Sequence, residues 1–173
     1  MSQRVRIGMI GGGQGAFIGA VHRIALRMDD AFDLVAGCFG RDPENTKITG
    51  EQLGIDATRC YPSWEQMIVD EAKLPEDQRI EAVSIVTPNH VHHGPAKAAM
   101  EAGFHVICDK PLCISQEQAD DLAATVSSTG RVFALTHNYC ASPMAREARE
   151  RVAGGDLGTI RKVYVEYLQG WLS

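Results

Sequence analysis

Apolar and polar positions along the chain follow two periods that take turns. Short continuous apolar runs, typical of strands buried in a parallel sheet, alternate with segments whose apolar residues recur every three or four positions, as in amphipathic helices. The apolar runs predict strands at Val5–Ile10, Phe32–Phe39, Thr58–Tyr61, Ala82–Thr87, Phe104–Cys108 and Val132–Thr136. The spaced segments predict helices at Ala16–Met28, Asp42–Leu53, Ser63–Ala72, Gly94–Ala102 and Ser115–Thr129. This alternation indicates an α/β fold, a doubly wound parallel sheet of the Rossmann type with strand order 3-2-1-4-5-6.

Helix start and stop signals support these boundaries. Asp42 is a good cap with a proline after it, and Ser63 stands three residues before Gln66, which is the spacing of a capping box. Gly103 and Gly130 follow two of the helices, as glycine does where it ends a helix in the left-handed conformation. We therefore expect residues 1–141 to form one Rossmann domain.

The last part of the chain does not fit into that sheet. It predicts a helix over Pro143–Ala153 and, after a glycine-rich turn, an alternating strand over Ile160–Leu168 that is typical of antiparallel sheets. One such strand is not stable alone in water, so we expect residues 142–173 to begin a second α/β domain whose body lies outside this chain. The strand is expected to pack against its own domain, to pair with another copy in a homo-oligomer, or to be disordered.

Composition and charge narrow the function classes. The chain has 173 residues, 45% hydrophobic and 23% charged, with a net charge of −5, which is ordinary for a globular protein. It has no basic stripe typical of nucleic-acid binding, and no apolar run suited to a membrane span or a secretory signal. The five cysteines form no C-x-x-C pair, so we expect buried free thiols in a reducing cytoplasm and no metal site.

A glycine-rich loop follows the first predicted strand directly. Gly11-x-Gly13-x-x-Ala16 fits the dinucleotide pattern G-x-G-x-x-G/A, and a longer loop that uses Gly19 as the helix-packing glycine fits equally well. Such a loop lets the backbone approach a pyrophosphate while the next helix presents free N–H groups to it. A methyltransferase, or a glycine-rich turn that binds nothing, would have a similar loop.

The end of the second predicted strand bears on the kind of nucleotide. NAD enzymes usually place a carboxylate there to bind the ribose hydroxyls, but this chain has Phe39, Gly40 and then Arg41. Without a carboxylate nothing repels a 2′-phosphate, and a guanidinium could pair with it, which favours NADP over NAD and disfavours a methyltransferase. The alternative is that Arg41 is a solvated loop residue and Asp42 only a helix cap.

Polar side chains follow the later strands at the edge where parallel sheets bind ligands. Thr87-Pro88-Asn89 ends one predicted strand, Asp109-Lys110-Pro111 ends the next, and His137-Asn138 ends the last. Lys110 is thereby held near the sheet, where it could donate to a substrate oxygen or carry a proton. The histidines at 90, 92 and 93 invite a zinc interpretation, but no cysteine or carboxylate stands nearby at ligand spacing. On the first predicted helix, His22 fits a packed structural histidine.

Together these segments resemble the Gfo/Idh/MocA family of oxidoreductases, which includes glucose–fructose oxidoreductase and inositol dehydrogenase. The resemblance rests on Gly19-x-x-His22, Thr87-Pro88-Asn89-x-x-His92, Asp109-Lys110-Pro111 and Gly155-Asp156-Leu157-Gly158, which occur in the family's order. It implies NADP or NAD as cofactor, a small-molecule sugar, inositol or related polyol as substrate, and Lys110 as the catalytic residue that assists proton transfer. The predicted cofactor-binding residues are Gly11, Gly13, Gln14, Gly15, Ala16, Phe17, Ile18, Arg41, Thr87, Pro88, Asn89, His92, Asp109, Lys110 and Asn138.

Three departures from the family's pattern limit this interpretation. The glycine loop is longer than usual, Asp109 stands where the family commonly has a glutamate, and the family's acid/base histidine of the substrate domain has no counterpart in this chain. The first hypothesis is therefore the cofactor-binding part of an NAD(P)-dependent oxidoreductase that transfers a hydride. The second, from another class, is a non-catalytic dinucleotide-binding or sensing module.

Overall fold

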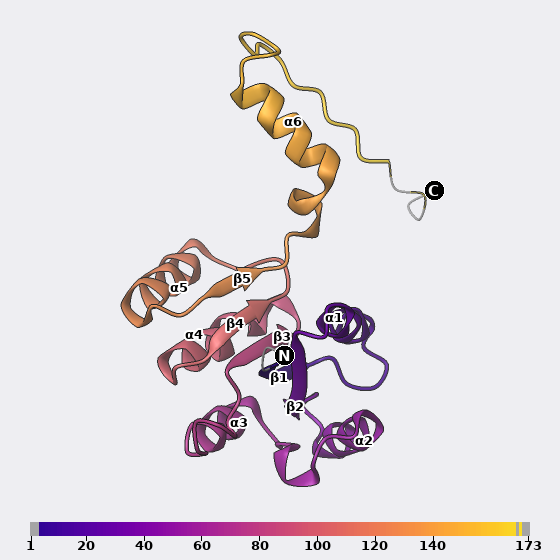
Figure 1. The fold of residues 1–173 in the computed structure, drawn as a ribbon, viewed down its shortest axis with the longest axis vertical. Coiled ribbons are helices and arrows are strands. Elements are labelled where there is room, and N and C mark those ends of the chain that lie inside the picture. Colours follow the sequence, from indigo (N-terminus) through magenta and orange to yellow (C-terminus); the bar gives the residue numbers. More distant parts are fainter. Residues whose placement is uncertain (1–3, 169, 171–173) are drawn as a thin grey trace. The chain divides into compact units, whose positions relative to one another are not determined.

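A computed structural model describes residues 4–168 and 170. The chain divides between Thr136 and His137 into two compact units, which are described separately (Figure 1). None of the helices in the described part of the chain is long and apolar enough to cross a membrane.

The first unit is built on a parallel, five-stranded sheet with strand order β2-β1-β3-β4-β5. Its strands are β1 (Val5–Gly11), β2 (Phe32–Cys38), β3 (Ala82–Val86), β4 (His105–Cys108) and β5 (Phe133–Leu135). The order reverses at β1 and β3, so the predicted doubly wound Rossmann fold is confirmed. Every residue of β3 is buried, which explains why four of its five residues are apolar; the exception, Ser84, lies within hydrogen-bond distance of His22.

One predicted strand is reduced to a single bridge. Thr58–Tyr61 was expected beside the second strand, and Cys60 does bridge Gly37 of β2 there, with the Tyr61 N–H donating to the Gly37 carbonyl over 2.8 Å. The sheet therefore has five strands rather than six. The cause is local, because the Asp56 carboxylate accepts hydrogen bonds from the Thr58 N–H and hydroxyl and so turns the chain into a short 3-10 helix.

Helices cover both faces of the sheet, with α1 and α2 on one side and α3, α4 and α5 on the other (Figure 1). These helices are α1 (Phe17–Met28), α2 (Pro43–Leu53), α3 (Trp64–Glu71), α4 (His93–Glu101) and α5 (Gln116–Thr129). The predicted caps form: Asp42 accepts from the Glu44 N–H, and Ser63 accepts from the Gln66 N–H. Each side of the sheet encloses its own apolar cluster, one around Phe104 and Met100 and the other around Met9.

A buried ion pair joins α3 to the segment before it. Glu71 is fully buried, and its carboxylate accepts hydrogen bonds from the Arg59 Nε over 2.9 Å, the Tyr61 hydroxyl over 2.8 Å and the Ile80 N–H over 3.0 Å. Burial, followed by the bond to Glu71, raises the pKa of Tyr61. The carboxylate thus ties two segments of the chain to α3, the one that contains Arg59 and Tyr61 and the one that contains Ile80.

The second unit contains α6 (Pro143–Ala153), with the bounds that the sequence predicts, and a 3-10 helix over Asn138–Ala141. The predicted strand Ile160–Leu168 is wrong, because residues 160–168 have no regular secondary structure. No other strand lies in the described part of this unit, so ladder hydrogen bonds are not available to it. The Tyr139 and Tyr167 rings pack edge to face, and their hydroxyls are 2.9 Å apart.

The Glu71 cluster predicts a large stability loss. We expect Glu71→Ala to lower the free energy of unfolding by about 3–5 kcal/mol, because the largely buried Arg59 side chain, 19% exposed, loses its counter-charge and the Tyr61 hydroxyl loses its acceptor. Urea denaturation followed by circular dichroism measures this change. Asp70→Ala is the matched control, because its half-exposed carboxylate pairs with Lys73 and Gln66 at the surface. Equal losses in the two variants would contradict the role of the buried cluster.

Candidate functional site

The glycine loop makes two close backbone approaches. A Cβ on Gly11 would lie 3.0 Å from the Thr87 nitrogen, and Gly11 and Gly12 both have φ in the left-handed region, at +86° and +74°. A Cβ on Gly19 would overlap Gly12 and lie 2.6 Å from its carbonyl oxygen. The sequence allows two alignments of the glycine pattern. This close approach supports the longer one, in which Gly19 is the glycine that lets α1 pack against the loop.

The loop is held in place by its neighbours. The Gly13 N–H donates to the Phe39 carbonyl over 2.9 Å, and the Gln14 N–H lies 3.1 Å from both Asn45 Oδ1 and Thr49 Oγ1 on α2. Arg23 of α1 donates to the Gly12 carbonyl over 2.7 Å. The N-cap residue of α1, Ala16, has no side-chain oxygen that could accept from the first N–H groups, and the first turn has no acidic residue. The α1 N-terminus therefore keeps donors and a positive dipole end for an anion.

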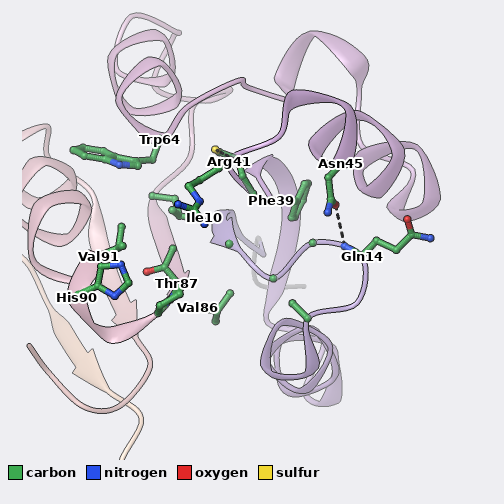
Figure 2. A pocket seen from close by; sticks show the side chains of 17 residues that line it. Ile10, Gln14, Phe39, Arg41, Asn45, Trp64, Val86, Thr87, His90 and Val91 are labelled. Atoms are coloured by element: carbon green, nitrogen blue, oxygen red, sulfur yellow. Dashed lines mark hydrogen bonds between the residues drawn. The ribbon is translucent and has the colours of Figure 1, made fainter.

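A cavity of about 440 Å³ lies where this loop meets the carboxyl ends of β1, β2 and β3 (Figure 2). Seven of the predicted site residues line it, namely Gly11, Gly13, Gln14, Ala16, Arg41, Thr87 and Pro88. Another seven belong to the same unit but lie outside its wall, namely Gly15, Phe17, Ile18, Asn89, His92, Asp109 and Lys110. Asn138 lies in the 3-10 helix of the second unit.

The wall also contains residues that were not among the predicted cofactor-binding residues. Phe39, Asn45, Trp64, His90 and Val91 all line the cavity. Asn45 had a weak signal, since it stands four residues before Thr49 on α2 and both side chains reach the loop. Trp64 had none, because its place in the wall depends on how α3 packs beside β2.

Arg41 lines the cavity just after the end of β2, and no acidic residue lines it there. The Arg41 side chain extends into the space between Trp64 and Phe39 (Figure 2). The next residue, Asp42, accepts from the Glu44 N–H over 3.0 Å and so serves as the cap of α2. No Asp or Glu is among the described residues that line the cavity. Positive charge is thus offered where a carboxylate would bind ribose hydroxyls.

One buried polar atom at the cavity lacks a partner. The Thr87 hydroxyl is buried and makes no hydrogen bond with any described residue. Such a group costs free energy unless something satisfies it, which is the situation expected at a ligand site. The orphan hydroxyl, the side-chain-free cradle at Gly11 and Gly13, and the absence of acid in the wall together fit a dinucleotide.

The segment around Lys110 follows β4 directly. The Asp109 N–H donates to the Ile85 carbonyl over 2.9 Å, and its carboxylate accepts from the Thr136 hydroxyl, also over 2.9 Å. His22 of α1 places its Nε2 3.6 Å from that carboxylate. Burial lowers the pKa of His22, and Asp109 opposes this effect. Burial also raises the pKa of the neighbouring Cys108 thiol to about 12, so this cysteine is a poor nucleophile.

The histidines after β3 lie in different environments. His92 is buried, with Nδ1 2.7 Å from the Pro111 carbonyl and Nε2 2.8 Å from the Thr87 carbonyl. His93 lies 2.7 Å from Asp121 on α5. Within residues 4–168 and 170, no three His, Cys, Asp or Glu side chains are grouped so that they could hold a metal ion.

The chain is similar to several oxidoreductases along almost all of its length. It is 40% identical over 172 residues to the uncharacterized oxidoreductase YfiI of Bacillus subtilis, with 99% of this chain and 43% of that protein covered. It is 31% identical to the levoglucosan dehydrogenase of Pseudarthrobacter phenanthrenivorans, with 98% and 42% covered. The chain thus spans less than half the length of these relatives.

A solved structure shows the same fold. The inositol dehydrogenase homolog of Azotobacter vinelandii, complexed with NAD⁺, superposes with a TM-score of 0.87 at 42% identity, covering 92% of this chain and 41% of that one. Residues 5–137 match the model of an oxidoreductase family with an NAD-binding Rossmann fold. The chain therefore belongs to the Gfo/Idh/MocA family of oxidoreductases.

Proposed function

We propose that this chain is the cofactor-binding part of a dehydrogenase that acts on a sugar, an inositol or a related polyol. The observation that carries the proposal is the cavity, in which a glycine cradle, an orphan Thr87 hydroxyl and an acid-free wall meet at the switch point of the sheet. Two relatives support the substrate class, one named levoglucosan dehydrogenase and one a homolog of inositol dehydrogenase. A bound nicotinamide supplies the hydride acceptor or donor.

The chain's own residues bind and orient in this proposal. The loop from Gly11 to Ala16 and the α1 N-terminus hold the pyrophosphate, and Thr87, Pro88 and Asn89 lie along the cofactor. Lys110 orients the substrate oxygen and assists removal of its proton. Lys110 lies outside the cavity wall but directly after β4, at the same edge of the sheet as Thr87.

We further propose that NADP is preferred to NAD. Arg41 reaches into the cavity, and no carboxylate in the wall repels a 2′-phosphate. Two solved structures of the Azotobacter homolog contain NAD⁺ and NADH, so the choice between the cofactors needs a direct titration.

The Arg41 proposal predicts a selective loss. We expect Arg41→Ala to weaken NADPH binding by about 10- to 100-fold, which is the effect of one charge-assisted hydrogen bond. NADH affinity should change less than about 2-fold, because NADH lacks the 2′-phosphate that this side chain would bind. Titration followed by quenching of tryptophan emission measures both. Arg27→Ala, at the last turn of α1, is the matched control. A wild type that binds NADH more tightly than NADPH would refute the preference.

The close approach of α1 to the loop predicts a second loss. Gly19→Ala places a methyl group against the Gly12 backbone, so α1 and its N–H groups must move away from the phosphates. We expect the affinity for either cofactor to fall at least about 10-fold. Gly94→Ala is the control, because its Cβ meets the Trp64 ring at an ordinary 3.5 Å. Unchanged binding in Gly19→Ala would show that the loop is not the phosphate site.

Binding and turnover are expected to separate in this chain. We expect the purified chain to bind cofactor and to show little or no turnover of inositols or anhydrosugars, since the family's acid/base histidine has no counterpart in it. Calorimetry measures the binding, and nicotinamide absorbance measures the turnover. Rapid turnover would refute this expectation, and failure to bind either dinucleotide would refute the proposed function.

A further inference from the structure

Lys110 is held by its neighbours in the chain rather than by its own side chain. Its ammonium group makes no hydrogen bond or ion pair with any of the residues that the structure describes, and the residue is exposed. A free lysine side chain has high rotamer entropy, so only a fixed backbone can keep it in one region. The residues on either side of it, Asp109 and Pro111, each contact a buried imidazole.

The imidazole that contacts Pro111, on the C-terminal side of Lys110, belongs to His92. Its side chain is only 1% exposed, and its two ring nitrogens face the Pro111 carbonyl at 2.7 Å and the Thr87 carbonyl at 2.8 Å. Carbonyl oxygens only accept, so a neutral ring donates to one of them and a doubly protonated ring to both. One ring therefore links the segment after β4 to the segment after β3 that lines the cavity.

The imidazole that contacts Asp109, on the N-terminal side of Lys110, belongs to His22. Its Nδ1 lies 3.1 Å from the hydroxyl of the fully buried Ser84, and its Nε2 lies 3.6 Å from the Asp109 carboxylate. The neutral ring that burial favours accepts from Ser84 at Nδ1 and turns Nε2–H toward Asp109. Since α1 also provides the N–H groups at the loop, His22 connects the phosphate end of the site to the lysine end.

We infer that His22 and His92 are positioning residues that fix Asp109 and Pro111 and thereby hold Lys110 at the cofactor edge. The inference deepens the proposed function and rests on it for the role of Lys110. The two rings reach the segment from different elements, α1 and the start of α4, so loss of either leaves the other contact in place. We expect a double variant of His22 and His92 to displace Lys110 more than either single variant does.

The position of Lys110 can be observed without any cofactor. Selective ¹⁵N-lysine labelling gives each lysine one backbone amide resonance, and the Lys110 resonance is identified by its absence in Lys110→Arg. We expect this resonance to differ from those of freely moving lysines in the wild type. In His22→Leu and His92→Leu it should move toward them and sharpen, because the backbone on one side of Lys110 is released.

Conservative variants separate positioning from loss of folding. In His92→Asn, the side-chain amide lies near the position of Nδ1 and keeps a donor for the Pro111 carbonyl. In His22→Gln, the amide lies near the position of Nε2 and keeps a donor for the Asp109 carboxylate. Both should retain most of the wild-type Lys110 resonance. His93→Asn is the matched control, because it removes the adjacent imidazole, which contacts Asp121 instead of the site. Should a leucine variant fail to fold, a polar variant replaces it. His92→Gln removes the contact with Pro111, and His22→Asn removes the contact with Asp109.

Cofactor titration supplies the second readout. We expect His92→Leu to weaken dinucleotide binding by about 10-fold, and Lys110→Ala to add less in that background than in the wild type. A Lys110 resonance that stays unchanged in both leucine variants would overturn the inference, whatever the binding shows. If the resonance moves in the variants but never responds to cofactor in the wild type, the positioning stands and the proposed role of Lys110 fails.

Discussion

The site depends on one close contact between two backbones. Gly19 of α1 packs against Gly12 of the loop, at a distance that leaves no room for a side-chain carbon on either residue. That contact sets how near α1 comes to the sheet and therefore where its unpaired N–H groups point. Arg23, one turn further along α1, reaches back to the Gly12 carbonyl and holds the same approach from the polar side. The cavity is thus shaped by the lack of side chains as much as by the side chains in its wall.

The parallel sheet then brings the remaining groups to the same edge. In register, Gly11 pairs with Val86, and Ile85 pairs with Cys108, so the segments that begin at Gly12, Thr87 and Asp109 leave the sheet side by side. Residues more than twenty positions apart in sequence become neighbours because every strand runs the same way. This explains why polar side chains that look scattered in the sequence can serve one ligand.

Local signals predicted most of this framework, and long-range contacts account for what they missed. The caps at Asp42 and Ser63 form as expected, because capping involves only residues two or three positions apart. The strand expected at Thr58–Tyr61 gave way to a turn, because Asp56 competes for the Thr58 N–H. His22 was expected to be structural, yet its partners Ser84 and Asp109 stand 62 and 87 positions away, where no spacing rule reaches.

The buried polar groups differ in whether the protein itself provides their hydrogen-bond partners. Glu71 is fully enclosed and has three partners, and Ser84 has His22, so each is satisfied by the fold itself. The Thr87 hydroxyl is also buried, yet among the buried side-chain oxygen and nitrogen atoms of the described residues it alone has no partner. A fold that satisfies its other buried groups gains nothing from this exception unless a ligand completes it. The open position lies in the wall beside the glycine cradle, which is where a dinucleotide would supply the missing partner.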